Sequence, residues 1–417
     1  MVTQKRNVWP VQYFQNPNPK KKLEEIWNDI DGYSFEDQFE KEDKYNKIDF
    51  VVPFPPLNYK GKIVKGVFYS QALDVIVERH PGLKKIFFPI ANSMFSSYPG
   101  SEYADMYFTC YKNKKREKWF KKNHPDKKDI IMLPLQDADF MNEYIMAPTF
   151  NTPKKIDVFC VTTAYPVKNL PMLAATLKMY ELKYAKRLNV VWAIGSRDAI
   201  RREDGTLDYS NMRWDAKAEL DKVKDILGGD IKKYVDIYPY IEYYELSRYY
   251  TGSKCCVLSS IMEGKNRGIF ESISCDTPII VFKDHNKFSR CGYPVFFGNS
   301  GEYAPEFTSE SLADTIHKVI TNQEKYEPRK NYLIYGGRKN FLNKIIDAQP
   351  YYKKNLPEYK KGKILENVWV DLAMQDNYQL STYDFLYGKN TAIQHITGIN
   401  NIDNIIKFFY SRFQVTD

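Results

Sequence analysis

The stretch that decides the fold is KCCVLSSIMEGKNRGIFESISCDTPIIVF, residues 254–282. It begins with an apolar run typical of a buried β-strand, passes through a short polar loop into a helix-length segment, and ends in a second apolar run that starts at Thr277-Pro278. Strand, loop, helix and strand in this order indicate a parallel sheet covered by helices. Two glutamates, Glu263 and Glu271, lie eight positions apart around the loop.

The start of the helix in this stretch predicts an anion site. We expect the helix to begin near Asn266 or Arg267, at the carboxyl edge of the sheet. The first N–H groups of a helix have no partner within it, and with the helix dipole they favour a bound anion. Gly264 and Gly268 permit close approach to the backbone, and Arg267 adds a positive charge. A phosphate or diphosphate is the natural ligand.

A nucleotide sugar contains hydroxyl groups beside its diphosphate, and the two glutamates suit these hydroxyl groups. Carboxylates accept hydrogen bonds well from vicinal hydroxyl groups, which a hexose or a ribose supplies. We expect Glu263 to bind the sugar and Glu271 the ribose. The alternative is that both are ordinary helix-capping and surface residues, since carboxylates are common in the first turn of a helix.

The alternation of strands and helices continues on both sides of this stretch. From 157 onward we expect strands at 157–164, 189–196, 234–240, 254–260 and 277–282, and helices at 169–187, 213–227, 242–251 and 267–275. This pattern predicts a doubly wound sheet whose apolar strands are buried on both faces.

The first part of the chain shows a similar alternation. We expect strands at 47–54, 62–69, 84–91, 104–111 and 128–135, and helices at 70–80 and 112–123. They predict a second parallel sheet covered by helices. The proline-containing stretch 146–157 is the best linker candidate. We therefore predict a first domain over 1–150, a second over 151–345 and a helical extension over 346–417, whose last helix packs on the first domain.

Composition limits the class of protein. The 417 residues are 43% hydrophobic and 27% charged, as in a globular protein with two domains. No apolar run is long enough to span a bilayer and the N-terminus lacks a signal-peptide pattern, so we expect a cytoplasmic location. The six cysteines form no CxxC pair, which favours buried thiols over disulfides or a zinc site.

The net charge of +9 favours anionic partners. The segment 112–122, KNKKREKWFKK, carries the strongest basic run and includes Trp119 and Phe120. A solvated helix face is the ordinary interpretation of such a run. The alternative interpretation is a peripheral contact between this segment and the inner face of an anionic membrane.

Residues 240–282 resemble the donor half of family 4 glycosyltransferases, which are retaining enzymes of GT-B architecture. The residues that match the family pattern in register are Glu245-Leu246, Val257-Leu258, Ser260, Glu263-Gly264, Glu271, Cys275, Thr277-Pro278 and Ile279-Ile280.

An upstream segment, 157–196, is similar to the first strand, loop and helix of the same donor domain. Lys168 matches the family lysine that contacts the donor diphosphate, and Gly195 matches the glycine that ends the next strand. The family's arginine five residues before the lysine is replaced by Thr163, for which Arg267 or Arg197 is a candidate substitute. Lys265 and Asn266 stand where the family usually has an aromatic residue and a glycine.

The resemblance implies two doubly wound Rossmann-like domains that face a central cleft, with helices at the C-terminus. It implies a UDP- or GDP-linked sugar as donor, a glycan or lipid-linked acceptor, retention of configuration, and no metal or other cofactor. Glu263 would orient the sugar and stabilise positive charge at its anomeric carbon. The residues that would bind the nucleotide are Lys168, Gly195, Gly264, Asn266, Arg267, Gly268 and Glu271. For His80, which ends a predicted helix, we expect a surface or capping role rather than catalysis.

Two other functions remain open from the sequence. Asp137-Ala138-Asp139 is a DxD triplet able to hold a divalent ion, as a metal-dependent glycosyltransferase would require, although Asp29-Ile30-Asp31 shows the same spacing without an obvious use. Alternatively, basic and tyrosine-rich surfaces could bind nucleic acid through phosphate contacts and stacking.

Overall fold

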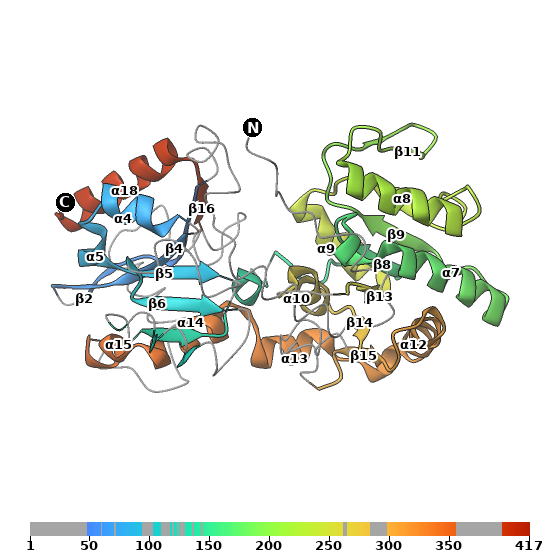
Figure 1. Ribbon diagram of the computed structural model, residues 1–417. Helices are drawn as coiled ribbons and strands as arrows, with labels where there is room; N and C mark the ends of the chain where they lie inside the picture. The colour runs from blue at the N-terminus through green and yellow to red at the C-terminus, as the bar shows by residue number, and fades with distance from the viewer. Residues whose placement is uncertain are drawn as a thin grey trace. The chain divides into compact units, whose positions relative to one another are not determined.

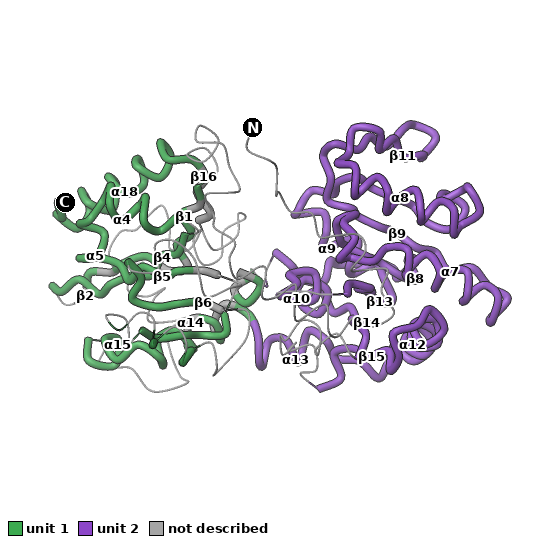
Figure 2. Tube along the Cα trace, in the orientation of Figure 1, with its two compact units in different colours: residues 1–7, 24–142, 337–417 green, residues 8–23, 143–336 purple. Residues whose placement is uncertain are grey.

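The structure is a computed structural model, shown in Figure 1. It describes residues 48–59, 61–70, 72–93, 103–109, 130–135, 137–141, 145–261, 265–283, 298–355 and 394–417, with the single positions 117, 118, 121, 122, 125 and 143. The described residues form two compact units (Figure 2). Those before 143 and after 336 make the first unit, and those from 143 to 336 make the second.

The second unit is built on a six-stranded sheet in which every pair of neighbouring strands is parallel. Its strands are β8 (Ile156–Val161), β9 (Val190–Ala193), β12 (Asp236–Tyr238), β13 (Ser253–Val257), β14 (Ile279–Phe282) and β15 (Gly301–Ala304). In space they run β12-β9-β8-β13-β14-β15. Counted from β8 in chain order this is 3-2-1-4-5-6, the order of the Rossmann fold. Five of these strands are the predicted ones, and β15 was missed because its sequence, GEYA, is short and only half apolar.

Helices cover both faces of this sheet (Figure 1). One face carries α7 (Leu170–Tyr184), α8 (Trp214–Ile226) and α12 (Ser309–Thr321), and the other carries α9 (Tyr243–Thr251), α10 (Arg267–Ser274) and α13 (Pro328–Tyr335). Side chains of β8 alternate between the two, as a pleated strand requires. Val158 and Cys160 enter the core under α7, α8 and α12, while the ring of Phe159 packs against Tyr249 and Tyr250 of α9. A small hairpin, β10 (Ile200–Arg201) with β11 (Leu207–Asp208), precedes α8.

The first unit also contains a six-stranded sheet, in the order β16-β1-β4-β5-β6-β7. Its strands are β1 (Asp49–Phe54), β4 (Gly66–Ser70), β5 (Phe87–Ser93), β6 (Met106–Thr109), β7 (Ile131–Leu133) and β16 (Gln394–Thr397). From β4 to β7 the strands are parallel.

The prediction of a wholly parallel first sheet was wrong for β1, which pairs antiparallel with both β4 and β16. A parallel pair needs a crossover of a dozen or more residues, usually a helix. Between β1 and β4 the chain has room only for a small hairpin, β2 (Leu57–Tyr59) with β3 (Lys62–Val64).

Helices cover both faces of the first sheet as well. On one face α4 (Leu73–Arg79), α5 (Leu83–Ile86) and α18 (Ile399–Phe413) enclose an aromatic core in which the rings of Phe87 and Phe409 are 5.1 Å apart. On the other face lie α14 (Gly337–Ala348) and α15 (Pro350–Asn355), with Phe341 against Phe108 of β6.

The predicted domain limits were 150 and 345, and the units of the structure divide at 142 and 336. The described residues of the segment predicted as a separate extension, 346–417, belong to the first unit. Within the described residues, no helix has the length and apolar composition needed to cross a membrane.

Candidate functional site

The strand order of the second unit reverses between β8 and β13, which lie side by side. In open parallel sheets of this kind, ligands bind outside the carboxyl ends of the strands at the point where the order reverses. Here the loop 162–169 follows β8 and the loop 258–266 follows β13. The first loop carries Lys168, and the second leads into α10, which carries Arg267, Gly268 and Glu271.

Hydrogen bonds join the two loops directly. The hydroxyl of Ser259 is 3.1 Å from the carbonyl oxygen of Lys168 and 3.0 Å from that of Asn169. The N–H of Ile261 donates to the carbonyl of Val167 at 2.8 Å. The backbone position of Lys168 is therefore fixed by the loop that leads to α10.

Lys168 ends a short 3-10 helix, η5 (Pro166–Lys168), and its side chain is half-buried. The chain turns there because Asn169 adopts a left-handed conformation with φ of 54°. Gly195, two residues after β9 ends, has φ of 56°, and a Cβ at this position would lie 3.3 Å from the carbonyl oxygen of Thr162. A larger residue at 195 would thus press on the loop that carries Lys168.

The start of α10 is capped by its own sequence. The helix begins at Arg267, as predicted, and the side-chain oxygen of Asn266 accepts a hydrogen bond from the N–H of Gly268 at 2.8 Å. A Cβ on Gly268 would lie 3.1 Å from that oxygen and 3.8 Å from the carbonyl oxygen of Val161 in β8. Gly268 therefore lets the helix approach the strand, and Asn266 already occupies one N–H that was expected to face a phosphate.

Glu271 is buried beneath this first turn, with 4% of its surface exposed. The hydroxyl of Tyr250 donates to its Oε2 at 3.0 Å, and Nε of Arg267 lies 2.9 Å from its Oε1. The guanidinium of Arg267 also stacks on Tyr243, 4.7 Å from the ring centroid. A surface position for Glu271, which the sequence left open, is thus wrong, and the charge of Arg267 is paired with this carboxylate.

Burial controls the ionisation of the tyrosines around Glu271. It raises the pKa of Tyr243 to about 12 and, with the nearby Glu271 charge, raises the pKa of Tyr250 well above its usual range. Both phenols therefore stay protonated at neutral pH, so the Tyr250 hydroxyl is a hydrogen-bond donor to the carboxylate.

Two predicted residues, Glu263 and Gly264, lie outside the described residues, so their roles stay predictions. Lys265, which follows them, places its ammonium 5.9 Å from the ring centroid of Phe270. The basic segment 112–122 also lies mostly outside the described residues, as do Asp29 and Asp31.

The sequence analysis missed a set of arginine–tyrosine contacts along the same edge of the sheet. The guanidinium carbons lie 4.0–4.9 Å from the ring centroids in the pairs Arg197–Tyr240, Arg201–Tyr238 and Arg213–Tyr165. The two members of each pair come from separate loops or strands, so the only signal in the sequence is the large number of tyrosines, 33 in all.

The DxD triplet lies in the first unit, in the 3-10 helix η4 (Asp137–Phe140). Asp139 is buried there, and α14 packs against this short helix. The described residues contain no group of three or more His, Cys, Asp or Glu side chains that could hold a metal ion.

His80 is the C-cap residue of α4, as expected, but it is not on the surface. Only 8% of it is exposed because α18 covers it, and its Nε2 lies 2.8 Å from a carboxylate oxygen of Asp403. The four described cysteines, Cys160, Cys255, Cys256 and Cys275, are buried and free, as predicted, and burial raises the pKa of Cys256 to about 12.

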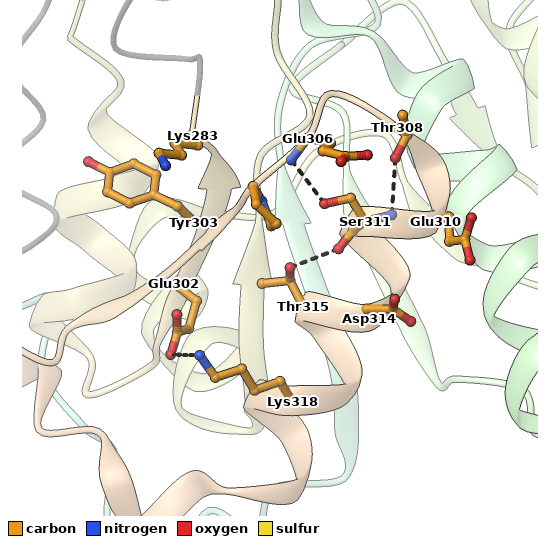
Figure 3. A pocket seen from close by; sticks show the side chains of 11 residues that line it. Lys283, Glu302, Tyr303, Glu306, Thr308, Glu310, Ser311, Asp314, Thr315 and Lys318 are labelled. Atoms are coloured by element: carbon orange, nitrogen blue, oxygen red, sulfur yellow. Dashed lines mark hydrogen bonds and ion pairs between the residues drawn. The ribbon is translucent and has the colours of Figure 1, made fainter.

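A separate pocket of about 680 Å³ opens on the second unit beside the edge strand β15 and α12 (Figure 3). Several of its charged side chains are paired with each other or with α7. Lys318 lies 2.7 Å from Glu302, and Lys183 of α7 lies 2.8 Å from Asp314. Because β15 is two strands away from β13, this pocket is not at the point where the strand order reverses.

Comparison with known proteins gives the class of this unit. Residues 146–339 match the family model described as glycosyl transferases group 1. This part, a little under half of the chain, is similar to that family. The match spans the whole sheet, both loops and α13, so these elements lie within the part of the chain that is similar to group 1 glycosyl transferases. No curated protein matches the chain.

Solved structures of similar shape include three enzymes. The sucrose-phosphate synthase of Thermosynechococcus elongatus is 14% identical, with 66% of this chain and 69% of that chain covered and a TM-score of 0.43. The pneumococcal O-GlcNAc transferase GtfA, in complex with UDP and GlcNAc, is 11% identical, with coverages of 72% and 62% and a TM-score of 0.43. The N-terminal domain of Candida albicans trehalose-6-phosphate phosphatase is 12% identical, with coverages of 82% and 79% and a TM-score of 0.45. At these TM-scores the likenesses say nothing about substrate.

Proposed function

We propose that this glycosyltransferase moves a sugar from a UDP- or GDP-linked donor to a hydroxyl of a glycan or lipid-linked acceptor, without a metal ion. One observation carries the proposal. The loop with Lys168 and the loop leading to α10 are hydrogen-bonded to each other where the strand order reverses, inside the segment that matches the family. A diphosphate at this place would meet the positive end of a helix and a lysine together.

The chemistry follows from where charge develops. When the bond between sugar and nucleotide breaks, negative charge accumulates on the leaving diphosphate. Lys168 and the first N–H groups of α10 are suited to stabilise that charge in place of a metal. Glu263 orients the sugar and stabilises the positive charge at its anomeric carbon, while Glu271 receives the ribose and Gly195 leaves room for the Lys168 loop.

The proposal for the acceptor comes from the composition of the chain. The basic run at 112–122 with its two aromatic residues suits an anionic lipid surface, where a lipid-linked acceptor would be found. Transfer should then rise when the acceptor is presented in vesicles that contain anionic lipid. Equal transfer to a soluble glycan would make the lipid surface irrelevant.

The test of the proposed reaction is incubation with a panel of nucleotide sugars, with and without a chelator. We expect slow hydrolysis of one UDP- or GDP-linked sugar, and we expect the same rate in the chelator. Loss of activity in the chelator would favour the metal-dependent alternative at Asp137 and Asp139. Salt-sensitive oligonucleotide binding without any response to nucleotides would favour the nucleic-acid alternative.

The variant Glu263→Ala tests the site within that reaction. Turnover should fall by about a hundredfold or more, because removing a group that stabilises transition-state charge commonly costs this much. The thermal midpoint should stay near that of the natural protein. Unchanged turnover would remove Glu263 from the mechanism.

A further inference from the structure

Glu271 is held in an unusual setting for a group that is proposed to meet a ligand. Its side chain is 5% exposed, and a buried carboxylate is costly unless donors and a countercharge surround it. Arg267 supplies the countercharge from the same helix, four residues earlier. The neutral donor, Tyr250, comes from α9, a different helix.

The ring of Tyr250 is fixed by its surroundings. The residue is fully buried, and its ring packs edge-on against Phe159 of β8 at a centroid distance of 5.0 Å. Its carbonyl accepts a hydrogen bond from the hydroxyl of Thr277 at 2.6 Å. The phenol therefore points up from the sheet to the first turn of α10, where a Cβ on Gly268 would lie 3.5 Å from its oxygen.

We infer that Tyr250 is a positioning residue for donor binding: its hydroxyl fixes the Glu271 carboxylate, and through it Arg267, in the orientation that receives the ribose. The inference rests on the proposed function. The Tyr250 hydroxyl donates a hydrogen bond to Oε2 of this carboxylate, and the Arg267 guanidinium lies in ion-pair contact with Oε1. Tyr250→Phe removes this donor, and because the last torsion of a glutamate is soft, the carboxylate then adopts a wider range of orientations.

The test uses Tyr250→Phe, with Tyr249→Phe as the matched control. Both changes remove a phenol oxygen from neighbouring residues of α9 whose rings both contact Phe159. Tyr249 faces Tyr238 instead of Glu271. We expect Tyr250→Phe to weaken the binding of UDP or GDP about tenfold by calorimetry, the scale of a lost hydrogen bond to a charged group. KM for the donor should rise by a similar factor while kcat changes less than about twofold.

Inorganic pyrophosphate separates the ribose contact from the phosphate contact. It lacks a ribose, so we expect it to bind the natural protein and Tyr250→Phe equally well. Equal UDP and GDP binding by both proteins would overturn the inference while leaving the proposed function intact. A loss shared by Tyr249→Phe, or an equal loss for pyrophosphate, would also overturn it. If the natural protein bound no nucleoside diphosphate, both proposals would fall.

A double-mutant cycle tests whether Tyr250 acts through Glu271. If the phenol acts only through the carboxylate, adding Tyr250→Phe to Glu271→Gln should weaken binding no further than Glu271→Gln alone. Additive losses would mean that Tyr250 acts by another route.

Discussion

At the scale of single residues, the binding properties of the site depend on which group accepts a hydrogen bond from each backbone N–H at the start of α10. The N–H of Gly268 is bound by the side chain of Asn266, so an incoming phosphate must compete with a residue of the protein itself. The capping preference of asparagine is readable in the sequence, but its consequence for the anion site is not, because it depends on side-chain geometry.

Asn266→Ala should expose this competition. Losing the cap should lower the free energy of unfolding by about 1 kcal/mol, or about 2–4 °C in the thermal midpoint of a domain of this size. Saturating UDP or GDP should then raise the midpoint more in the variant than in the natural protein, because the freed N–H of Gly268 takes a phosphate oxygen.

The matched control for this prediction is Thr308→Ala. Thr308 caps α12 in the same way, with its hydroxyl 3.1 Å from the N–H of Ser311, but it follows β15, which lies two strands from β13. The Thr308→Ala variant should lose a similar free energy of unfolding. Saturating nucleotide should raise its thermal midpoint no more than that of the natural protein. Equal ligand shifts in both variants would show that Asn266 and the phosphate do not share a donor.

At the scale of elements, α10 is supported at its C-terminal end by Arg329 of α13. The guanidinium donates to the carbonyl of Ser274 at 2.5 Å and to that of Glu143 at 3.0 Å. One side chain thus joins the end of α10, the start of the second unit and α13. A helix that presents its first turn to a ligand needs such support at the other end.

Arg329→Met should therefore destabilise the second unit. Leaving these carbonyls without their donor should cost about 2 kcal/mol in the free energy of unfolding, and Arg329→Lys should recover only part of it because lysine lacks the planar fork. Denaturant melts of the two variants measure this. Arg202→Met, which removes an exposed pair with Asp208, should leave the midpoint unchanged. A similar shift in Arg202→Met would refute the special role of Arg329.

In the first unit, α18 is joined to α4 by Asp403. Hydrogen bonds from Arg79, together with His80, hold the pKa of Asp403 below its usual range despite its burial. A carboxyl group with a lowered folded-state pKa adds stability above its unfolded pKa, near 3.9, and loses it as the pH falls through the folded value. Acid should therefore loosen α18.

Hydrogen exchange of the α18 amides at pH 7 and pH 3 measures this effect. Asp403→Asn should increase exchange at pH 7, and the difference from the natural protein should shrink at pH 3. A constant difference at both pH values would mean that the ionised carboxylate does not stabilise the helix.

At the scale of the whole molecule, sequence patterns predicted two α/β sheets and most of the strands in each. They succeed in the second unit because parallel strands buried on both faces read as apolar runs separated by amphipathic helices. They fail at β1 and β16, where pairing is antiparallel and joins segments more than 300 residues apart. Local patterns carry no information on such pairs.

The same limit applies to the site. Lys168 and Gly195 were predicted from their match to the family pattern, and the start of α10 was predicted from the order of strand, loop and helix in the sequence. Tyr250 was not predicted, because its contact with Glu271 joins α9 to α10 and depends on how these two helices pack, which the sequence does not show.

The most direct test of the central claim is a crystal structure with UDP or GDP bound. We expect a diphosphate within hydrogen-bonding distance of Lys168 and of the first N–H groups of α10, with the ribose at Glu271. A nucleotide bound instead near Asp137 and Asp139 through a divalent ion, or in the pocket beside β15, would contradict it.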